Sequence, residues 1–218
     1  RHPTAARRPA PARARSASAM AARDAPQAPH LVAGRNCGDC NACCVALSID
    51  APDLRKPEGY RCRNARRDNS CAIYATRPQT CRTFYCGWRR LKWVREPLRP
   101  DRSGVLIRLH GEVSRTDGSR RLGVMISLLT RAALKAEGLA ETVAAAVAAG
   151  APVYLHIPGP PGYTGGTARI NEAVAEAVGR RDKAAVLRIL RGLHAEGRKG
   201  DFRPVVFEGT EHDKCRSP

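Results

Sequence analysis

The distribution of cysteines constrains this chain more than any other feature of its sequence. Eight of the nine cysteines lie between residues 37 and 86, and the ninth, Cys215, lies close to the end. Disulfide scaffolds spread their cysteines over a whole small domain, whereas metal sites gather them locally. The eight clustered residues are therefore the predicted metal ligands: Cys37, Cys40, Cys43, Cys44, Cys62, Cys71, Cys81 and Cys86.

The spacing of the first four cysteines narrows the choice of metal. In CGDCNACC, residues 37–44, a C-x2-C step occurs twice in succession. Three thiolates at this spacing with a distant fourth are typical of 4Fe–4S clusters, and two separated C-x2-C pairs would instead favour zinc. The sequence mildly favours an iron–sulfur cluster and leaves zinc open. Because neighbouring side chains usually point apart, the adjacent Cys43 and Cys44 serve two centres, or one of them is a packed thiol.

Two other thiol chemistries fit the sequence less well. A disulfide framework would suit the even number of clustered cysteines, but the Arg-rich beginning of the chain lacks the apolar region of an export leader. A thioredoxin-like dithiol would need a strand before CGDC and a helix beginning at it. We therefore expect a cytoplasmic protein with reduced thiols.

Composition sets only broad limits on the function of the protein. The formal net charge is +18, mostly from arginine, which favours contact with nucleic acid or anionic membranes. Charge alone is weak support, and solvated basic faces are the simpler interpretation. No apolar run is long enough to cross a membrane, and no Walker loop or H-E-x-x-H motif is present.

Changes in amino-acid composition along the chain predict four regions. Residues 1–35 are rich in Ala, Pro and Arg and are expected to be disordered. Residues 36–93 form a metal-binding module of loops and short helical turns, residues 94–198 an α+β domain, and residues 199–218 a C-terminal tail. The expected fold class is α+β, with a loop-rich cysteine module packed on a small sheet with two or three helices.

Periodicity predicts the elements of the second half. GVLIRLHGEVSRT and RRLGVMISLL flank a turn and predict an antiparallel hairpin, and APVYLHIPG predicts a further strand. LAETVAAAVAAG predicts a helix with Leu139, Val143, Ala146 and Val147 on one face. Two more helices are expected in residues 168–197, the second with Asp182 as its N-cap, and the glycine-rich IPGPPGYTGG is expected to be a loop.

Residues near the cysteines suggest how a metal centre would be supported. Arg77 and Arg82 flank Cys81 and can offset the negative charge of a tetrathiolate site. Asp39 and Asn41 can hydrogen-bond to backbone or sulfur between the first ligands. Four aromatic residues are expected to wrap the centre: Tyr74, Phe84, Tyr85 and Trp88. His110, His156 and His194 are expected in strands or a helix and not as ligands.

These motifs resemble those of a known family. CGDCNACC, then Cys62, then CAIYATRPQTCRTFYCGW is similar to the YkgJ-type cysteine-cluster (CxxCxxCC) family, described as zinc- or iron-chelating. The resemblance covers about residues 37–88. It implies a bacterial intracellular metalloprotein whose ligands include Cys37, Cys40, Cys43, Cys44, Cys71 and Cys81, and less directly Cys62 and Cys86.

A second hypothesis follows from the same resemblance. Flagellin lysine-N-methylases carry a similar cluster, so the alternative is a protein-modifying or redox enzyme. It predicts a substrate pocket between the cysteine module and the hairpin. Residues 95–218 receive no function from the resemblance, and a nucleic-acid-binding zinc module is a third, less supported alternative because basic and aromatic residues are not interleaved.

Overall fold

The structure is a computed structural model that describes residues 30–68, 70–113 and 118–207. The chain from Leu31 onward belongs to one compact unit. Most of the predicted disordered tail, most of the predicted C-terminal tail and Cys215 lie outside the described residues. The boundary predicted at residues 93 and 94 stays a prediction.

The cysteine-bearing half contains short elements separated by turns, as predicted. Its only described strands form a two-stranded antiparallel ribbon in which Ile49 pairs with Lys56. The elements are α1 (Ala42–Ala46), β1 (Ile49–Ala51), β2 (Leu54–Lys56), η2 (Tyr74–Thr76), α2 (Gln79–Thr83), α3 (Gly87–Arg90), η3 (Glu96–Leu98) and α4 (Pro100–Ser103).

A four-stranded sheet forms the centre of the other half. Its strands are β3 (Val105–Val113), β4 (Arg120–Leu128), β5 (Val153–Ile157) and β6 (Gly166–Arg169), in the order β3-β4-β5-β6. The hairpin β3–β4 and strand β5 confirm the predictions, and β5 runs parallel to β4. Strand β6 was not predicted, because this short, mostly exposed edge strand is defined by its antiparallel pairing with β5 and not by an apolar pattern.

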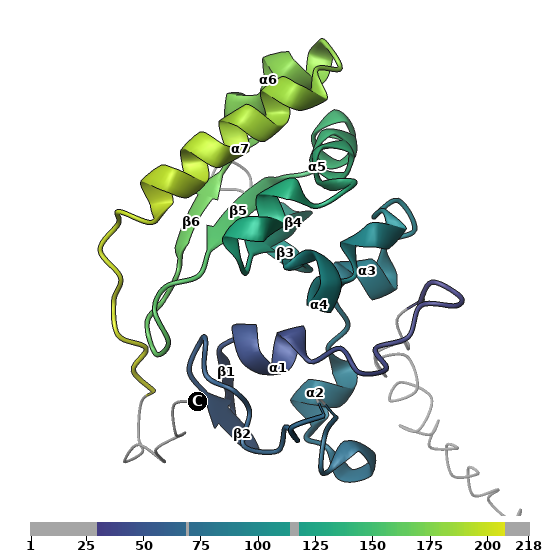
Figure 1. Cartoon of the computed structure of the whole chain (residues 1–218), viewed down its shortest axis with the longest axis vertical. Coiled ribbons are helices and arrows are strands. Elements are labelled where there is room, and N and C mark those ends of the chain that lie inside the picture. Colours follow the sequence, from purple (N-terminus) through teal and green to yellow (C-terminus); the bar gives the residue numbers. More distant parts are fainter. Residues whose placement is uncertain (1–29, 69, 114–117, 208–218) are drawn as a thin grey trace, which may run out of the picture. The chain divides into compact units, whose positions relative to one another are not determined.

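Three helices follow the predicted pattern and pack together. They are α5 (Leu139–Ala148), α6 (Asn171–Gly179) and α7 (Lys183–Gly197), with a 3-10 helix, η4 (Arg131–Lys135), before α5. Asp182 caps α7, since its side chain accepts a hydrogen bond of 2.8 Å from the Ala185 N–H. Figure 1 shows α5, α6 and α7 grouped beside the sheet. The α+β class is confirmed.

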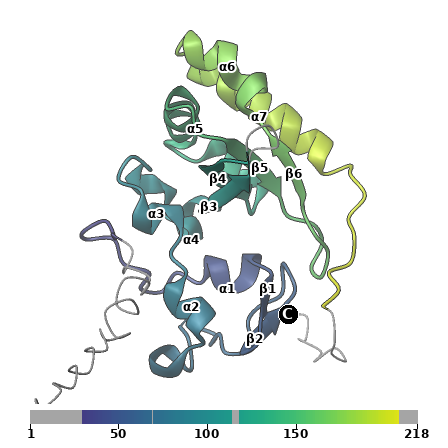
Figure 2. The same cartoon turned by 180° about the vertical axis from the view of Figure 1, so that it is seen from behind.

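The second half of β4 is buried on both faces, but the two faces differ in character. On β4, Val124, Ile126 and Leu128 join the apolar core that α5, α6 and α7 cover, as strand alternation requires. The intervening Met125 and Ser127 are also buried. Seen from either side, α1 and the β1–β2 ribbon lie away from the three helices (Figures 1 and 2). The face that carries Ser127 meets the cysteine-bearing half, since Ser127 and His156 line a cavity together with Glu58 and the end of α1.

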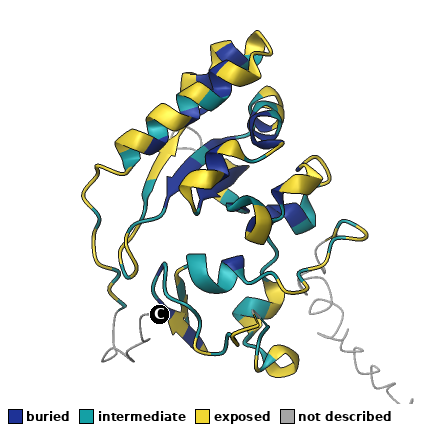
Figure 3. Cartoon of the chain, in the orientation of Figure 1, coloured by how far each residue is buried: buried dark blue, intermediate teal, exposed yellow. Residues whose placement is uncertain are grey.

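Burial is concentrated in the sheet and its helices, whereas the cysteine-bearing segments are mostly half-buried or exposed (Figure 3). Between residues 37 and 86, the buried apolar side chains of the described chain are Ala42 and Leu54. No described helix is long and apolar enough to span a membrane. An apolar core of its own therefore does little to hold the cysteine-bearing half together.

The helix α3 joins the last clustered cysteine to the sheet. Trp88 is buried in the main core, and its Nε1 donates to the Glu96 carbonyl at 3.0 Å. Trp88 thus packs in the apolar core and is not reserved for wrapping a metal centre, whereas Tyr74 is 59% exposed. Both residues were expected to wrap the metal centre, but one is buried in the core and the other is exposed to solvent.

Gly87 allows the close approach of α3 to the sheet. A Cβ at this position would lie 2.6 Å from Ile107 Cγ2, and Ile107 is fully buried on β3. Gly87→Ala is expected to lower the free energy of unfolding by about 1–3 kcal/mol, measured by urea denaturation, because the packed core has no room for the added methyl group. The control is Gly192→Ala, on an exposed stretch of α7 with no atom within 4 Å, which should gain up to about 1 kcal/mol. Equal stability of the two variants would refute this packing role.

Candidate metal centre

The eight clustered cysteines are all free thiols and all half-buried. The first segment is a tight turn, in which the Cys40 N–H donates to the Cys37 carbonyl at 2.8 Å. Gly38, inside this turn, has a φ of 53°, in the left-handed region that favours glycine. The turn leads into α1, which carries Cys43 and Cys44.

Four cysteines, three of them in the segment that leads into and begins α1, interact electrostatically with one another, and we call them set A. It comprises Cys37, Cys40, Cys43 and Cys86. Burial, against hydrogen bonds from the backbone of Ala42 and Asp101, raises the pKa of Cys40 to about 11, and the negative charges of Asp101 and Cys86 contribute to this rise. Burial, and then the charge of Cys37, raises the pKa of Cys86, against hydrogen bonds from the backbone of Arg89 and Trp88. Cys86 comes from just before α3, more than forty positions along the chain.

A second set of four cysteines, set B, is defined by its electrostatic interactions with Cys81. It comprises Cys44, Cys62, Cys71 and Cys81. Burial raises the pKa of Cys81, and the charges of the other three thiolates raise it further. The backbone supports the same grouping, since the Cys62 N–H donates to the Cys44 carbonyl at 3.0 Å and Cys71 forms a β-bridge with Ala65.

The two sets meet at the adjacent pair on α1. The Cys43 thiol donates a hydrogen bond to Cys44, which raises the pKa of Cys43 well above its ordinary value, and burial raises it further. The same bond lowers the pKa of Cys44 to about 7, with help from the charges of Lys56, Arg77 and Arg61. The double cysteine therefore contributes one thiol to each set.

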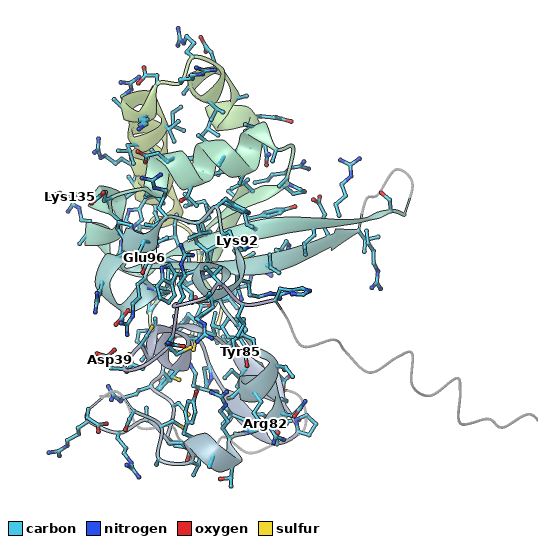
Figure 4. All side chains as sticks on the ribbon, turned by 90° about the vertical axis from the view of Figure 1, so that its right-hand side faces the viewer. Asp39, Arg82, Tyr85, Lys92, Glu96 and Lys135 are labelled. Carbon is cyan, nitrogen blue, oxygen red and sulfur yellow. The ribbon has the colours of Figure 1, made fainter. Side chains whose placement is uncertain are left out.

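Positive side chains accompany both sets. In set A, Arg89 Nη1 lies 3.6 Å from Cys37 Sγ, and Arg99 donates to the Cys37 carbonyl at 3.0 Å and pairs with Asp39. Asp39 lies on the loop before α1 (Figure 4). Arg77 acts on set B, in keeping with the sequence prediction. Arg82 is exposed on α2, and no described contact joins it to a cysteine.

Lys56, a buried cation that acts on Cys44 of set B, was not predicted from the sequence. Its side chain is 1% exposed, and Nζ donates to the carbonyls of Val45, Pro57 and Tyr60 at 2.9, 3.0 and 2.7 Å. These bonds join the end of α1 to the turn before Cys62. The sequence gives only an indirect signal for its burial: in LRK, the lysine alternates with the buried Leu54 on one face of a short strand before a Pro-Glu-Gly turn.

Lys56→Met keeps the length of the side chain and removes its donors. Three half-buried carbonyls then lose a charged partner, so the free energy of unfolding is expected to fall by about 3 kcal/mol. In the metal-free protein, the pKa of Cys44 should also rise, because Lys56 lowers it. Lys92→Met, at an exposed lysine (Figure 4), is the control and should change stability by less than about 0.5 kcal/mol. Urea denaturation that finds K56M as stable as K92M would contradict this role.

The thiols of set A and set B are ligands of the kind that soft metals prefer, since thiolates select zinc and iron–sulfur clusters. Arg89 Nε is buried without a hydrogen-bond partner in the described chain and could donate to an anionic centre beside Cys37. As the side chains stand, no three His, Cys, Asp or Glu groups among the described residues are placed to hold one metal ion. Rotation of the thiols would have to bring each set together.

The histidines lie where they were expected, on β3, β5 and α7. Buried His156 lies between Glu58 and Ser127, with Nε2 3.2 Å from Glu58 Oε1 and Nδ1 3.1 Å from Ser127 Oγ. These residues and Arg108 line a cavity of about 100 Å³ between the cysteine-bearing half and the hairpin. Ligand sites usually measure about 300–1,000 Å³, so this cavity suits water or a small ion and not a nucleoside-sized methyl donor.

The chain was compared with known protein families, with curated proteins and with solved structures, and none of these comparisons finds a match.

Proposed function

We propose that this is a cytoplasmic metal-binding protein with two centres, each bound by four thiolates. Set A would hold one centre and set B the other. The observation that carries the proposal is the division of eight free thiols into two sets of four that meet at Cys43 and Cys44. The metal is an iron–sulfur cluster of the 4Fe–4S type, or zinc, in agreement with the resemblance to the YkgJ-type cysteine-cluster family.

Charge and burial support this proposal. Four thiolates around a divalent zinc carry a net charge of about −2, which is costly to bury unpaired. Arg89 and Arg99 accompany set A, and Lys56, Arg61 and Arg77 accompany set B. A bound centre would also supply the cohesion that the few buried apolar side chains of residues 37–86 do not.

The metal identity decides what the protein could do. An iron–sulfur cluster would supply one-electron transfer and zinc would supply structural stability, while the chain's own residues shield the sulfur atoms and balance their charge. The enzymatic alternative, a protein-modifying or redox enzyme, gains no support from the small cavity at His156. We therefore do not propose a reaction.

Elemental analysis of protein purified without oxygen tests this proposal. Brown protein with iron, acid-labile sulfide and broad visible absorption is expected for the iron–sulfur version. Colourless protein with two zinc ions per chain would instead select the zinc version. The Cys215→Ser variant is the control, since Cys215 belongs to neither set, and it should retain the full metal content. Protein that holds neither metal, and takes up neither on anaerobic reconstitution, would refute the proposal.

A further inference from the structure

A pocket of about 650 Å³ lies between η4 and α7, away from both cysteine sets in the sequence. Five of its seven lining residues carry a cationic or titratable side chain. From η4 come Arg131 and Lys135, and from α7 and its C-cap come Arg191, His194 and Arg198. The three α7 positions recur at helical spacing and so share one face of the helix. Figure 4 labels Lys135 at this edge of the unit.

None of the four cations at this pocket pairs with a carboxylate in the described chain. Two lysines at the ends of α7 do have partners: Lys183 Nζ, at its first residue, lies 2.8 Å from Glu141, and Lys199 Nζ, just after its C-cap, lies 2.8 Å from Glu196. The pocket therefore concentrates positive charge that the protein itself leaves uncompensated, beside an apolar lining of Leu134 and Ala195.

We propose that this pocket binds a phosphate-rich small molecule of nucleotide size. Arginine forks match phosphate oxygens in geometry and charge. The volume falls within the range of small-molecule sites, and the apolar lining can contact the part of the ligand that carries no phosphate. The proposal goes beyond metal binding and does not depend on it.

His194 gives this site a pH dependence. It is buried in the lining, and burial lowers its pKa, as do the charges of Arg198 and Arg131. The other charged groups that face it are Lys135 and Arg191. Ligand phosphates would compensate these charges and raise the pKa of His194. Binding should therefore take up protons, and affinity should increase as the pH falls from about 8 to about 6.

Isothermal titration of the purified full chain with ATP, inorganic triphosphate and a single-stranded RNA, without magnesium, tests the proposal. ATP is expected to bind, and R191E/R198E should weaken it by about tenfold or more because two charge-assisted contacts are reversed. R120E/R121E makes the same change of net charge at exposed positions of β4 and should change affinity by less than about twofold. Far-UV circular dichroism checks that both variants fold.

Three further results decide the matter. H194Q should abolish the proton uptake and keep ATP binding at about pH 8. Triphosphate that binds as tightly as ATP would support the site and identify free polyphosphate as its ligand. The proposal fails if neither compound binds, if both charge variants weaken binding equally, or if only RNA binds, since the last result would indicate a nucleic-acid surface.

Discussion

Replacing Cys71 and Cys81 by serine is expected to remove one of two metal centres and leave the other intact. Both residues belong to set B, and Cys81 interacts with the other three members of that set. Replacing Cys40 and Cys86, in set A, should remove the other centre. A tetrahedral thiolate site that loses two of four ligands no longer holds its metal tightly. Metal analysis of each variant should therefore give half of the wild-type content.

A variant with one substitution in each set separates two centres from one. Cys40→Ser combined with Cys81→Ser weakens both sites and is expected to lose more metal than either within-set variant. If a single centre drew ligands from both sets, the two within-set variants would not each retain half of the metal. Equal loss in all three double variants would overturn the division into set A and set B.

Metal removal is expected to unfold the cysteine-bearing half and leave the sheet folded. Structural zinc contributes roughly 10–16 kcal/mol in small zinc domains, and among the described apolar side chains of residues 37–86 only Ala42 and Leu54 are buried. Hydrogen exchange after chelation should show lost amide protection in residues 37–86. Residues 124–128 and 153–157, within the main core, are the internal control and should remain protected.

Two other patterns of hydrogen exchange would contradict this expectation. Unchanged protection of residues 37–86 after complete chelation would mean that contacts such as those of Lys56 hold this half without metal. Loss of protection throughout the chain would mean that the two halves unfold together. In that case, α3 and Trp88 would transmit the instability from Cys86 to the core.

Local patterns predicted much of the fold. The hairpin β3–β4 follows from two apolar strands around a turn, and the α7 N-cap follows from Asp182 at the start of a helical pattern. Strand β6 was missed because its pairing with β5 is a long-range backbone interaction. The packing of Trp88 in the main core was not predicted, because its proximity to Cys86 in the sequence suggested a place in the cysteine module, around the metal or in that module's own core.

The grouping of the cysteines could not be read from their spacing. Spacing brings Cys37, Cys40 and Cys43 together, but it does not say that Cys86 joins them while Cys81 joins Cys44. These assignments depend on the paths by which the long loops return to α1. The same reason hid Lys56 and Arg89, whose charges reach the thiols through the fold.

Native mass spectrometry combined with thiol alkylation tests the central claim most directly. The anaerobically purified chain should carry two centres, with the eight clustered cysteines protected from alkylation and Cys215 free to react. Chelation should expose all nine thiols. A chain that carries one centre, or whose clustered cysteines react fully before chelation, would contradict two four-thiolate sites that meet at Cys43 and Cys44.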